Sequence, residues 1–454
     1  TPLGSCTGIP GEESTMPMSS RMSSTFLGGR RARLGALCLM LLLIAAVGLY
    51  PVSLVTVGWD GQQTDGLSRH FSLARNGDLI AVMSEATNLV PDDTNGVRDV
   101  FVVDRKSKTA VCVSVSTEGK HADGDSASGA LSEDGRYIAF HSIATNLVPG
   151  DVNGVNDVFL RDLKSGDLKR ITVGYDGSET DSGAAWPGIS KNGRFVAYRS
   201  SATNLVPGDN NGVADVFVYD LKKGTTTRVT RTLAGGEIDD DATRHRISPN
   251  GRYVAVLTAA TNIVPGDTNG HADVFVYDLR KGTITLASRG LGGEPGDGGC
   301  FQPSFSRNAR YVAFPSYATN LVPDDNNGVA DVFVYDMKRG LTERCSVNSA
   351  GVEGNGDCYV TDFARNGRIL YFDSHASNLV PDDNNDSRDV FVHDRTTGRT
   401  ERVSLGILGQ EANANSYRPR TTRNGKLLAI FSEADNLVPD DLNGVLDVFV
   451  IEEK

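Results

Sequence analysis

The chain lacks the sequence signatures that mark most enzyme classes. Its seven histidines form no HExxH pair, and no GxSxG, P-loop or GxGxxG stands between an expected strand and an expected helix. Its six cysteines include no CxxC pair, which excludes the usual structural zinc spacings. We therefore expect a non-enzymatic protein. An acid–base pair assembled from carboxylates far apart in the chain stays open, because such a pair leaves no local motif.

Positive charge is scarce. The net charge is −12, and because the first 48 residues are basic, the rest of the chain carries −14. An acidic surface repels nucleic-acid phosphates and anionic membrane surfaces. We therefore expect no nucleic-acid partner, and the charge favours cations or basic proteins.

A helical apolar period is absent after residue 50, and a longer regularity takes its place. The motif Asn-[Leu/Ile]-Val-Pro-x-Asp-x-Asn-x-x-x-Asp-Val-Phe occurs seven times, each copy 58 residues after the last. A unit this short cannot bury its own apolar face, and stacking it against its neighbours produces a continuous core. The period predicts one repeat domain over residues 52–454.

Each unit has the pattern of four short strands. In the second unit, apolar runs at 130–133 and 136–140 flank Asp134-Gly135, a strong hairpin signal. A long loop then leads to two further runs at 158–160 and 168–173. Four-stranded antiparallel units repeated around a ring are the blades of a β-propeller.

The two ends of the repeat region indicate how the ring closes. The last unit has a third strand at 448–451 and no fourth, whereas residues 53–58 align with the fourth strand at 169–174. Pairing the two ends in one blade removes the free sheet edges. The sequence therefore predicts an all-β fold, a seven-bladed propeller closed by its N-terminal strand.

Three hairpins carry a family resemblance. The segments SEDGRYIAF (132–140), SKNGRFVAY (190–198) and SPNGRYVAV (248–256) resemble the WD40-like PD40 repeat of TolB-type β-propellers. The resemblance covers all seven units and implies the fold. It implies no single function, because that superfamily includes translocation-system proteins, peptidase gating domains and carbohydrate-active enzymes. The seven units also differ from the six blades and extra N-terminal domain of TolB itself.

The repeated loop presents oxygen side chains at alternate positions, a glycine and a later carboxylate, which resemble half of a calcium loop. The same residues would also suit a metal-free turn, so both interpretations stay open. The candidate calcium ligands are Asp93, Asn95, Asp99, Asp151, Asn153, Asp157, Asp209, Asn211, Asp215, Asp267, Asn269, Asp273, Asp325, Asn327, Asp331, Asp383, Asn385, Asp389, Asp441, Asn443 and Asp447.

A second acidic column follows a recurring glycine in the fourth-to-first-strand connection, as at Asp65 and Asp123. In a propeller both long connections emerge on one face, so we expect an acidic loop face that contacts a protein or glycan. Cys300 and Cys358 lie one period apart in a column of small residues. They would serve as small buried side chains or pair as a disulfide.

Columns that are identical in every unit are most simply architecture, so an asymmetric site must come from columns that vary. The start of the innermost strand varies most. It and its neighbouring columns supply the candidate channel-mouth ligands His70, Trp186, Arg244, His245, Tyr359, Tyr417 and Arg418.

The N-terminus predicts export. A basic and polar leader spans 1–33, with Met16, Met18 or Met22 as candidate starts, and an uncharged apolar run spans 34–49. Such a run is short for a bilayer span and suits a signal peptide, which places the propeller in the periplasm or outside the cell. The alternative is a membrane anchor at 34–49, the one membrane contact that we expect.

Together these features predict an exported, monomeric binding or scaffold module, with calcium as the candidate cofactor. The alternative is a carbohydrate-active lyase or hydrolase with its site at the channel mouth.

Overall fold

The computed structural model describes residues 51–439 and 441–452, all within the compact unit Leu49–Lys454. The expected leader at 1–33 and the apolar segment at 34–49 lie outside the described residues. No helix in the described ranges has the length and apolarity needed to cross a membrane.

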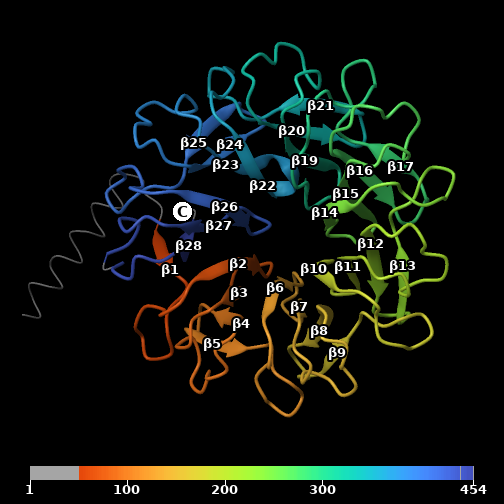
Figure 1. The fold of residues 1–454 in the computed structure, drawn as a ribbon. Helices are drawn as coiled ribbons and strands as arrows, with labels where there is room; N and C mark the ends of the chain where they lie inside the picture. The colour runs from red at the N-terminus through yellow and green to blue at the C-terminus, as the bar shows by residue number, and fades with distance from the viewer. Residues whose placement is uncertain (1–50, 440, 453–454) are drawn as a thin grey trace, which may run out of the picture. The chain divides into compact units, whose positions relative to one another are not determined.

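The described chain forms seven four-stranded antiparallel sheets, one for each repeat, arranged as blades in a ring (Figure 1). The predicted all-β, seven-bladed propeller is confirmed. The second Asp of each motif copy begins the third strand of its blade, so the 58-residue period of the sequence is the blade-to-blade period.

Blades are numbered here from the first complete one. Blade 1 is β2 (Ser68–Leu73), β3 (Leu79–Ser84), β4 (Asp99–Asp104) and β5 (Thr109–Cys112). Blade 2 is β6 (Ser126–Leu131), β7 (Tyr137–Ser142), β8 (Asp157–Asp162) and β9 (Leu168–Arg170). Blade 3 is β10 (Ala184–Ile189), β11 (Phe195–Ser200), β12 (Asp215–Asp220) and β13 (Thr225–Arg228). Blade 4 is β14 (Ala242–Ile247), β15 (Tyr253–Thr258), β16 (Asp273–Asp278) and β17 (Ile284–Leu286).

Blade 5 is β18 (Ser304–Phe305), β19 (Tyr311–Ser316), β20 (Asp331–Asp336) and β21 (Leu341–Arg344). Blade 6 is β22 (Cys358–Ala364), β23 (Ile369–Ser374), β24 (Asp389–Asp394) and β25 (Arg399–Arg402), with a short 3-10 turn at Arg365–Gly367. Blade 7 is β26 (Ser416–Thr421), β27 (Leu427–Ser432), β28 (Asp447–Glu452) and β1 (Val52–Leu54).

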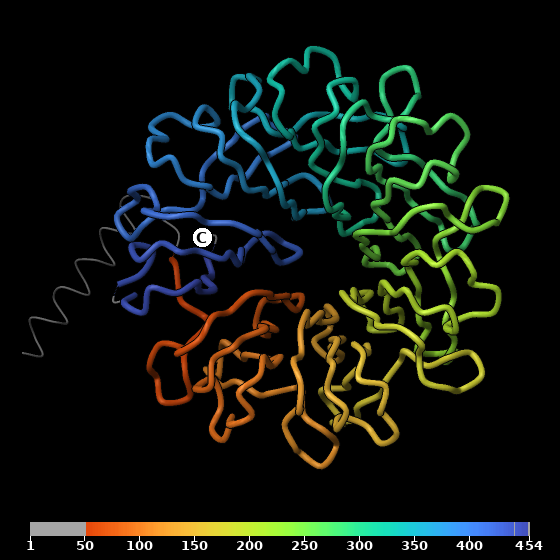
Figure 2. The backbone as a smooth tube through the Cα atoms, viewed as in Figure 1, coloured from red at the N-terminus to blue at the C-terminus, as the bar shows by residue number. Residues whose placement is uncertain are grey.

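Blade 7 joins the two ends of the propeller. β1 pairs antiparallel with β28, with Val52 opposite Ile451 and Leu54 opposite Phe449. Figure 2 shows the start of the described chain lying beside its blue end. This confirms the closure expected from residues 53–58 and gives β28 a partner on both sides.

The core lies between blades. In blade 1, Val100 packs with Ile138 and Phe140 of blade 2 in one buried cluster, and the other large clusters likewise join neighbouring blades. The motif phenylalanine is fully buried in each blade, for example Phe217 and Phe391. A single unit would leave these faces in water, which is why the repeats require the ring.

Cys300 and Cys358 are buried free thiols. Each Sγ donates a hydrogen bond to a serine hydroxyl of the adjacent strand, Ser316 at 3.4 Å and Ser374 at 3.3 Å. Both cysteines therefore act as small buried side chains, and the disulfide alternative is not what forms.

Candidate functional site

The second acidic column holds the two long loops of each blade together. In blade 2, Asp123 accepts hydrogen bonds from the backbone N–H of Thr145 at 2.7 Å and from its hydroxyl at 2.9 Å. Asp65 makes the same pair of bonds to Thr87. These carboxylates are satisfied within their own blades, which accounts for their recurrence without an external ligand.

The motif loop is fixed by its asparagine and its closing aspartate. In blade 5, Asn327 Nδ2 donates to Asp331 Oδ2 at 2.7 Å and to the Gly354 carbonyl at 2.9 Å. The Ser346 hydroxyl donates to the other oxygen of Asp331. The loop is thereby tied to the connection that leads into the next blade.

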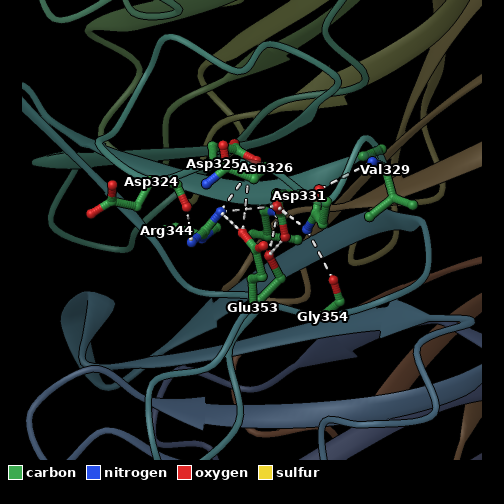
Figure 3. A network of polar contacts seen from close by, with 12 residues as sticks. Asp324, Asp325, Asn326, Val329, Asp331, Arg344, Glu353 and Gly354 are labelled. Carbon is green, nitrogen blue, oxygen red and sulfur yellow. Dashed lines mark hydrogen bonds and ion pairs between the residues drawn. The ribbon is translucent and has the colours of Figure 1, made fainter.

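In four blades an arginine occupies the space between the motif carboxylates. In blade 5, Arg344 Nη1 lies 3.2 Å from Asp325 Oδ1, 3.4 Å from Asp331 Oδ2 and 2.6 Å from Glu353 Oε2 (Figure 3). Arg170, Arg228 and Arg402 make the same three contacts in blades 2, 3 and 6. The chain thus supplies its own cation at these four loops.

The other three blades have no such arginine. At its position they carry Leu54, Cys112 and Leu286, and at the position of the paired glutamate they carry Gln63, His121 and Pro295. Arginine and glutamate are thus present together or absent together in every blade. Burial raises the pKa of Asp273 in blade 4 to about 6, and the charge of Asp267 adds to the shift.

A separate pocket of about 580 Å³ lies at the innermost strands, and its lining is basic. Six arginines line it, and its lining includes no aspartate or glutamate within the described residues; the arginines are Arg69, Arg98, Arg244, Arg246, Arg418 and Arg420. A chain with a net charge of −12 therefore concentrates positive charge in its channel.

β-Bulges shape this lining. The register of the innermost strand slips between Ala185 and Gly188 in blade 3 and between Tyr417 and Arg420 in blade 7. Trp186 and Arg418 sit in these slips with φ of 55° and 53°, a left-handed conformation that side chains rarely adopt. Bulges of this kind redirect side chains next to binding sites, and here both residues line the pocket.

Four of the arginines, two from blade 4 and two from blade 7, have no carboxylate in an ion pair within the described chain. Hydrogen bonds of their guanidinium groups run to backbone carbonyls, as from Arg420 to Pro419 at 2.9 Å and from Arg418 to Arg69 at 3.3 Å. Burial, followed by the charge of Arg420, lowers the pKa of Arg246 to about 9, although Asp362 partly offsets this. The cluster therefore holds positive charge that Asp362 offsets only in part.

The histidines of the pocket add no charge at pH 7. Burial lowers the pKa of His70 to about 3 and the pKa of both His141 and His245 to about 4. Nδ1 of His70 and Nδ1 of His141 are buried without a hydrogen-bond partner among the described residues. The pocket thus combines permanent guanidinium charge with neutral imidazoles.

Most of the expected channel-mouth residues meet in this pocket. It is lined by His70, Trp186, Arg244, His245, Tyr417 and Arg418. The seventh, Tyr359, is not in the lining and instead packs under Arg388, whose guanidinium lies 4.1 Å from its ring centre.

Sequence reasoning missed Arg246 and Arg420. They share a column two residues beyond Arg244, and residues two apart in a strand face the same side. That column also varies from blade to blade, with Asp362 as its acidic member. Extending the search by two positions would have found them.

A ring of seven antiparallel blades around a lined pocket defines the protein as a β-propeller. No protein-family model and no curated protein sequence matches the chain. Solved structures do match it, and these structural neighbours are TolB-type and other β-propeller proteins.

The propeller domain of the trilobed protease from Pyrococcus furiosus is 9% identical, with a TM-score of 0.52, over 86% of this chain and 95% of that one. An oligogalacturonate lyase in complex with manganese is 11% identical, with a TM-score of 0.50, over 89% of this chain and 96% of that one. TolB from Acinetobacter baumannii is 14% identical, with a TM-score of 0.38, over 83% and 70%. At these identities the matches show the fold alone.

Proposed function

We propose that the protein is an exported, non-enzymatic binding module whose channel pocket takes an anionic ligand, with an acidic oligosaccharide as the best-matched class. The observation that carries this proposal is the cluster of Arg244, Arg246, Arg418 and Arg420, which lines one pocket and forms no ion pair among the described residues. Export rests on the basic leader and the apolar run that precede the propeller in the sequence.

The chemistry of the lining fits sugar acids. Guanidinium groups bind carboxylates through paired hydrogen bonds, and partial burial strengthens such bonds. Trp186, which is 41% exposed, and Tyr417 add flat apolar faces beside the charges. Arg244 already lies 4.3 Å from the centre of the Trp186 ring, so a stacked and charged surface is in place before a ligand arrives.

The matching experiment measures binding of an oligogalacturonate by calorimetry. We expect the double variant Arg246→Gln/Arg420→Gln to lower the affinity by at least about a hundredfold, because each lost charge-assisted bond contributes about 1.5–3 kcal/mol. The affinity of the unaltered protein should also fall as salt is added, since the attraction is screened.

Two controls make this result specific. Arg280 lies at an exposed turn between β16 and β17, away from the innermost strand of its blade. Arg280→Gln removes the same charge there and should leave the affinity unchanged. A neutral oligogalactose of the same length should not compete. Equal binding of the neutral sugar, or an undiminished affinity of the double variant, would refute an anion site in the channel.

The second candidate is a carbohydrate-active lyase or hydrolase that uses the same pocket. It is favoured by the buried imidazole of His245, which lines the pocket and whose two ring nitrogens have no hydrogen-bond partner among the described residues. One structure with a similar fold is an oligogalacturonate lyase, although that match is 11% identical. If the oligogalacturonate became shorter during the binding experiment, and if this shortening were lost in His245→Phe, the result would favour the enzyme.

We further propose that calcium stabilises the loops of blades 4 and 7, which lack an internal arginine, with Asp267, Asn269 and Asp273 of blade 4 as the clearest set. Their carboxylates and amide are the oxygen ligands that calcium prefers. An arginine-filled loop such as that of Asp325 already has its cation and needs none.

Calcium added to chelator-treated protein should raise the melting temperature by about 2 °C or more, since a ligand of the folded state stabilises it by mass action. The rise should shrink in Asp267→Asn. It should persist in Asp325→Asn, which alters an arginine-filled loop. An absence of any rise with calcium would remove the metal from the proposal. We also propose that the acidic loop face binds a protein or a glycan. Titration with a basic protein would test the protein ligand.

A further inference from the structure

The loop of blade 1 differs from all the others in the chemistry of its side chains. Where four blades carry arginine and glutamate, blade 1 carries Cys112 at the end of β5 and His121 in the following connection. The two motif carboxylates, Asp93 and Asp99, are retained. A thiol, an imidazole and two carboxylates thus take the place of the arginine network.

Three of these groups lie close together, and the fourth, Asp93, faces one of them. Ligand atoms of Asp99, Cys112 and His121 all lie within 4.8 Å of one another. Nδ1 of His121 lies 4.0 Å from Oδ1 of Asp93. Asp99 is the first residue of β4 and Cys112 the last residue of β5, two strands that pair with each other, and Asp93 and His121 come from the adjoining loops.

Two of the candidate ligand atoms are buried and have no hydrogen-bond partner among the described residues. Asp93 is 8% exposed, and its Oδ1 has no hydrogen-bond partner among the described residues. Nδ1 of His121 is also buried and unpartnered in that part of the chain. In blade 5 the corresponding Oδ1, that of Asp325, faces the guanidinium of Arg344 at 3.2 Å. Blade 1 therefore keeps the acceptor and lacks the arginine.

We propose that Asp93, Asp99, Cys112 and His121 form a zinc site in blade 1. Thiolate, imidazole and carboxylate are the ligands of Zn²⁺, whereas Ca²⁺ takes oxygen ligands alone. One residue of each kind plus a second carboxylate supplies the four ligands of a tetrahedral site.

Outer contacts already orient Asp99, the most buried ligand. Asn95 Nδ2 donates to Asp99 Oδ2 at 2.6 Å, and the Ser114 hydroxyl donates to Oδ1. Hydrogen bonds of this kind fix the direction of a metal ligand.

Binding must displace a proton. An ordinary cysteine thiol is mostly protonated at pH 7, so the free site holds S–H. The Cys112 S–H bond breaks, the sulfur donates its electron pair to Zn²⁺, and the proton leaves to buffer. No oxidant or reductant takes part.

The test is a titration of Zn²⁺ into metal-free full-length protein by calorimetry in two buffers of different ionisation enthalpy. We expect one zinc per chain and about one proton released per zinc. Cys112→Ala and His121→Gln should each weaken binding more than about tenfold, the loss seen even when outer contacts of a metal are removed. Cys300→Ala and His271→Gln, which change the same residue types in other blades, should bind zinc as the unaltered protein does.

A double variant guards against loss of folding. Cys112→Arg/His121→Glu gives blade 1 the pair that blades 2, 3, 5 and 6 carry, so it should fold, melt at or above the temperature of the unaltered apoprotein and bind no zinc. Zinc binding that survives in this variant overturns the proposal. So does failure of the unaltered protein to bind zinc, or competition of Ca²⁺ with Zn²⁺ at equal concentration.

Discussion

Replacing Arg402 with methionine is expected to lower the free energy of unfolding by about 3–5 kcal/mol at pH 7, the usual cost of removing one partner of a buried ion pair. The side chain of Arg402 is 8% exposed, and Nη1 lies 3.0 Å from Asp383, 3.2 Å from Asp389 and 2.9 Å from Glu411. The variant would leave two buried carboxylates without a cation. Denaturant unfolding followed by circular dichroism measures the loss.

The stability lost in Arg402→Met should depend on pH. Burial raises the pKa of Asp383 to about 6 even with Arg402 present, and methionine at 402 would raise it further. A carboxyl whose pKa is raised in the folded state binds more protons there than in the unfolded chain, so stability increases as pH falls through that pKa. The difference between variant and unaltered protein should therefore be largest above pH 7 and shrink toward pH 5.

Blade 7 offers a matched comparison, because it carries Leu54 and Gln63 at the positions of the arginine and the glutamate. Arg402→Leu/Glu411→Gln should cost less than Arg402→Leu alone, since it removes one of the unpaired charges. Arg399→Met, at an exposed side chain of the same strand, should change stability little. Equal losses in Arg399→Met and Arg402→Met would show that the buried network is not the cause.

The blades could be predicted from the sequence because the local signals for strands and turns agreed with the repeat spacing of the whole propeller. The apolar runs, the Asp134-Gly135 turn and the fixed spacing all gave the same four strands. The count of seven followed from residues 53–58, and the structure pairs Val52–Leu54 at the start of this segment with β28.

The arginine network could not be found by reading one motif copy. Arg344 lies 19 residues after Asp325, at the end of β21, and Glu353 lies in the next connection. Only the fold brings the three together, and the motif alone resembles a calcium loop. The signal that does survive in the sequence is the joint presence or absence of arginine and glutamate in each repeat, which becomes visible when columns are compared in pairs.

Part of the channel pocket could be predicted from the sequence by comparing columns between repeats. A search for the most variable column led to Trp186 and Arg418, which line the pocket. It did not show that their backbones sit in bulges, because nothing in either residue type favours a φ near 55°. Tyr359 belongs to a neighbouring column, and only its packing under Arg388 shows that it leaves the pocket.

Removing the closing strand is expected to lower the melting temperature by about 10 °C or more. The comparison is between chains beginning at residue 51 and at residue 59, so both lack the leader. The shorter chain loses buried Val55, worth about 1.5–3 kcal/mol, and the hydrogen bonds of β1, at about 0.5–1.5 kcal/mol each. It also loses the bond from Thr56 to Asp447, 2.6 Å long and buried.

The loss would open β28 along its outer edge, because β1 is the strand that covers it. An open edge pairs with other chains, so the shorter protein should associate as its concentration rises. A synthetic peptide of residues 51–58 should restore the melting temperature by adding the missing strand, and the same peptide with Val55→Asp should not, because its charge would enter the buried cluster around Phe71. An unchanged melting temperature in the shorter chain would mean that packing between blades, and not the pairing of β1 with β28, holds the ring closed.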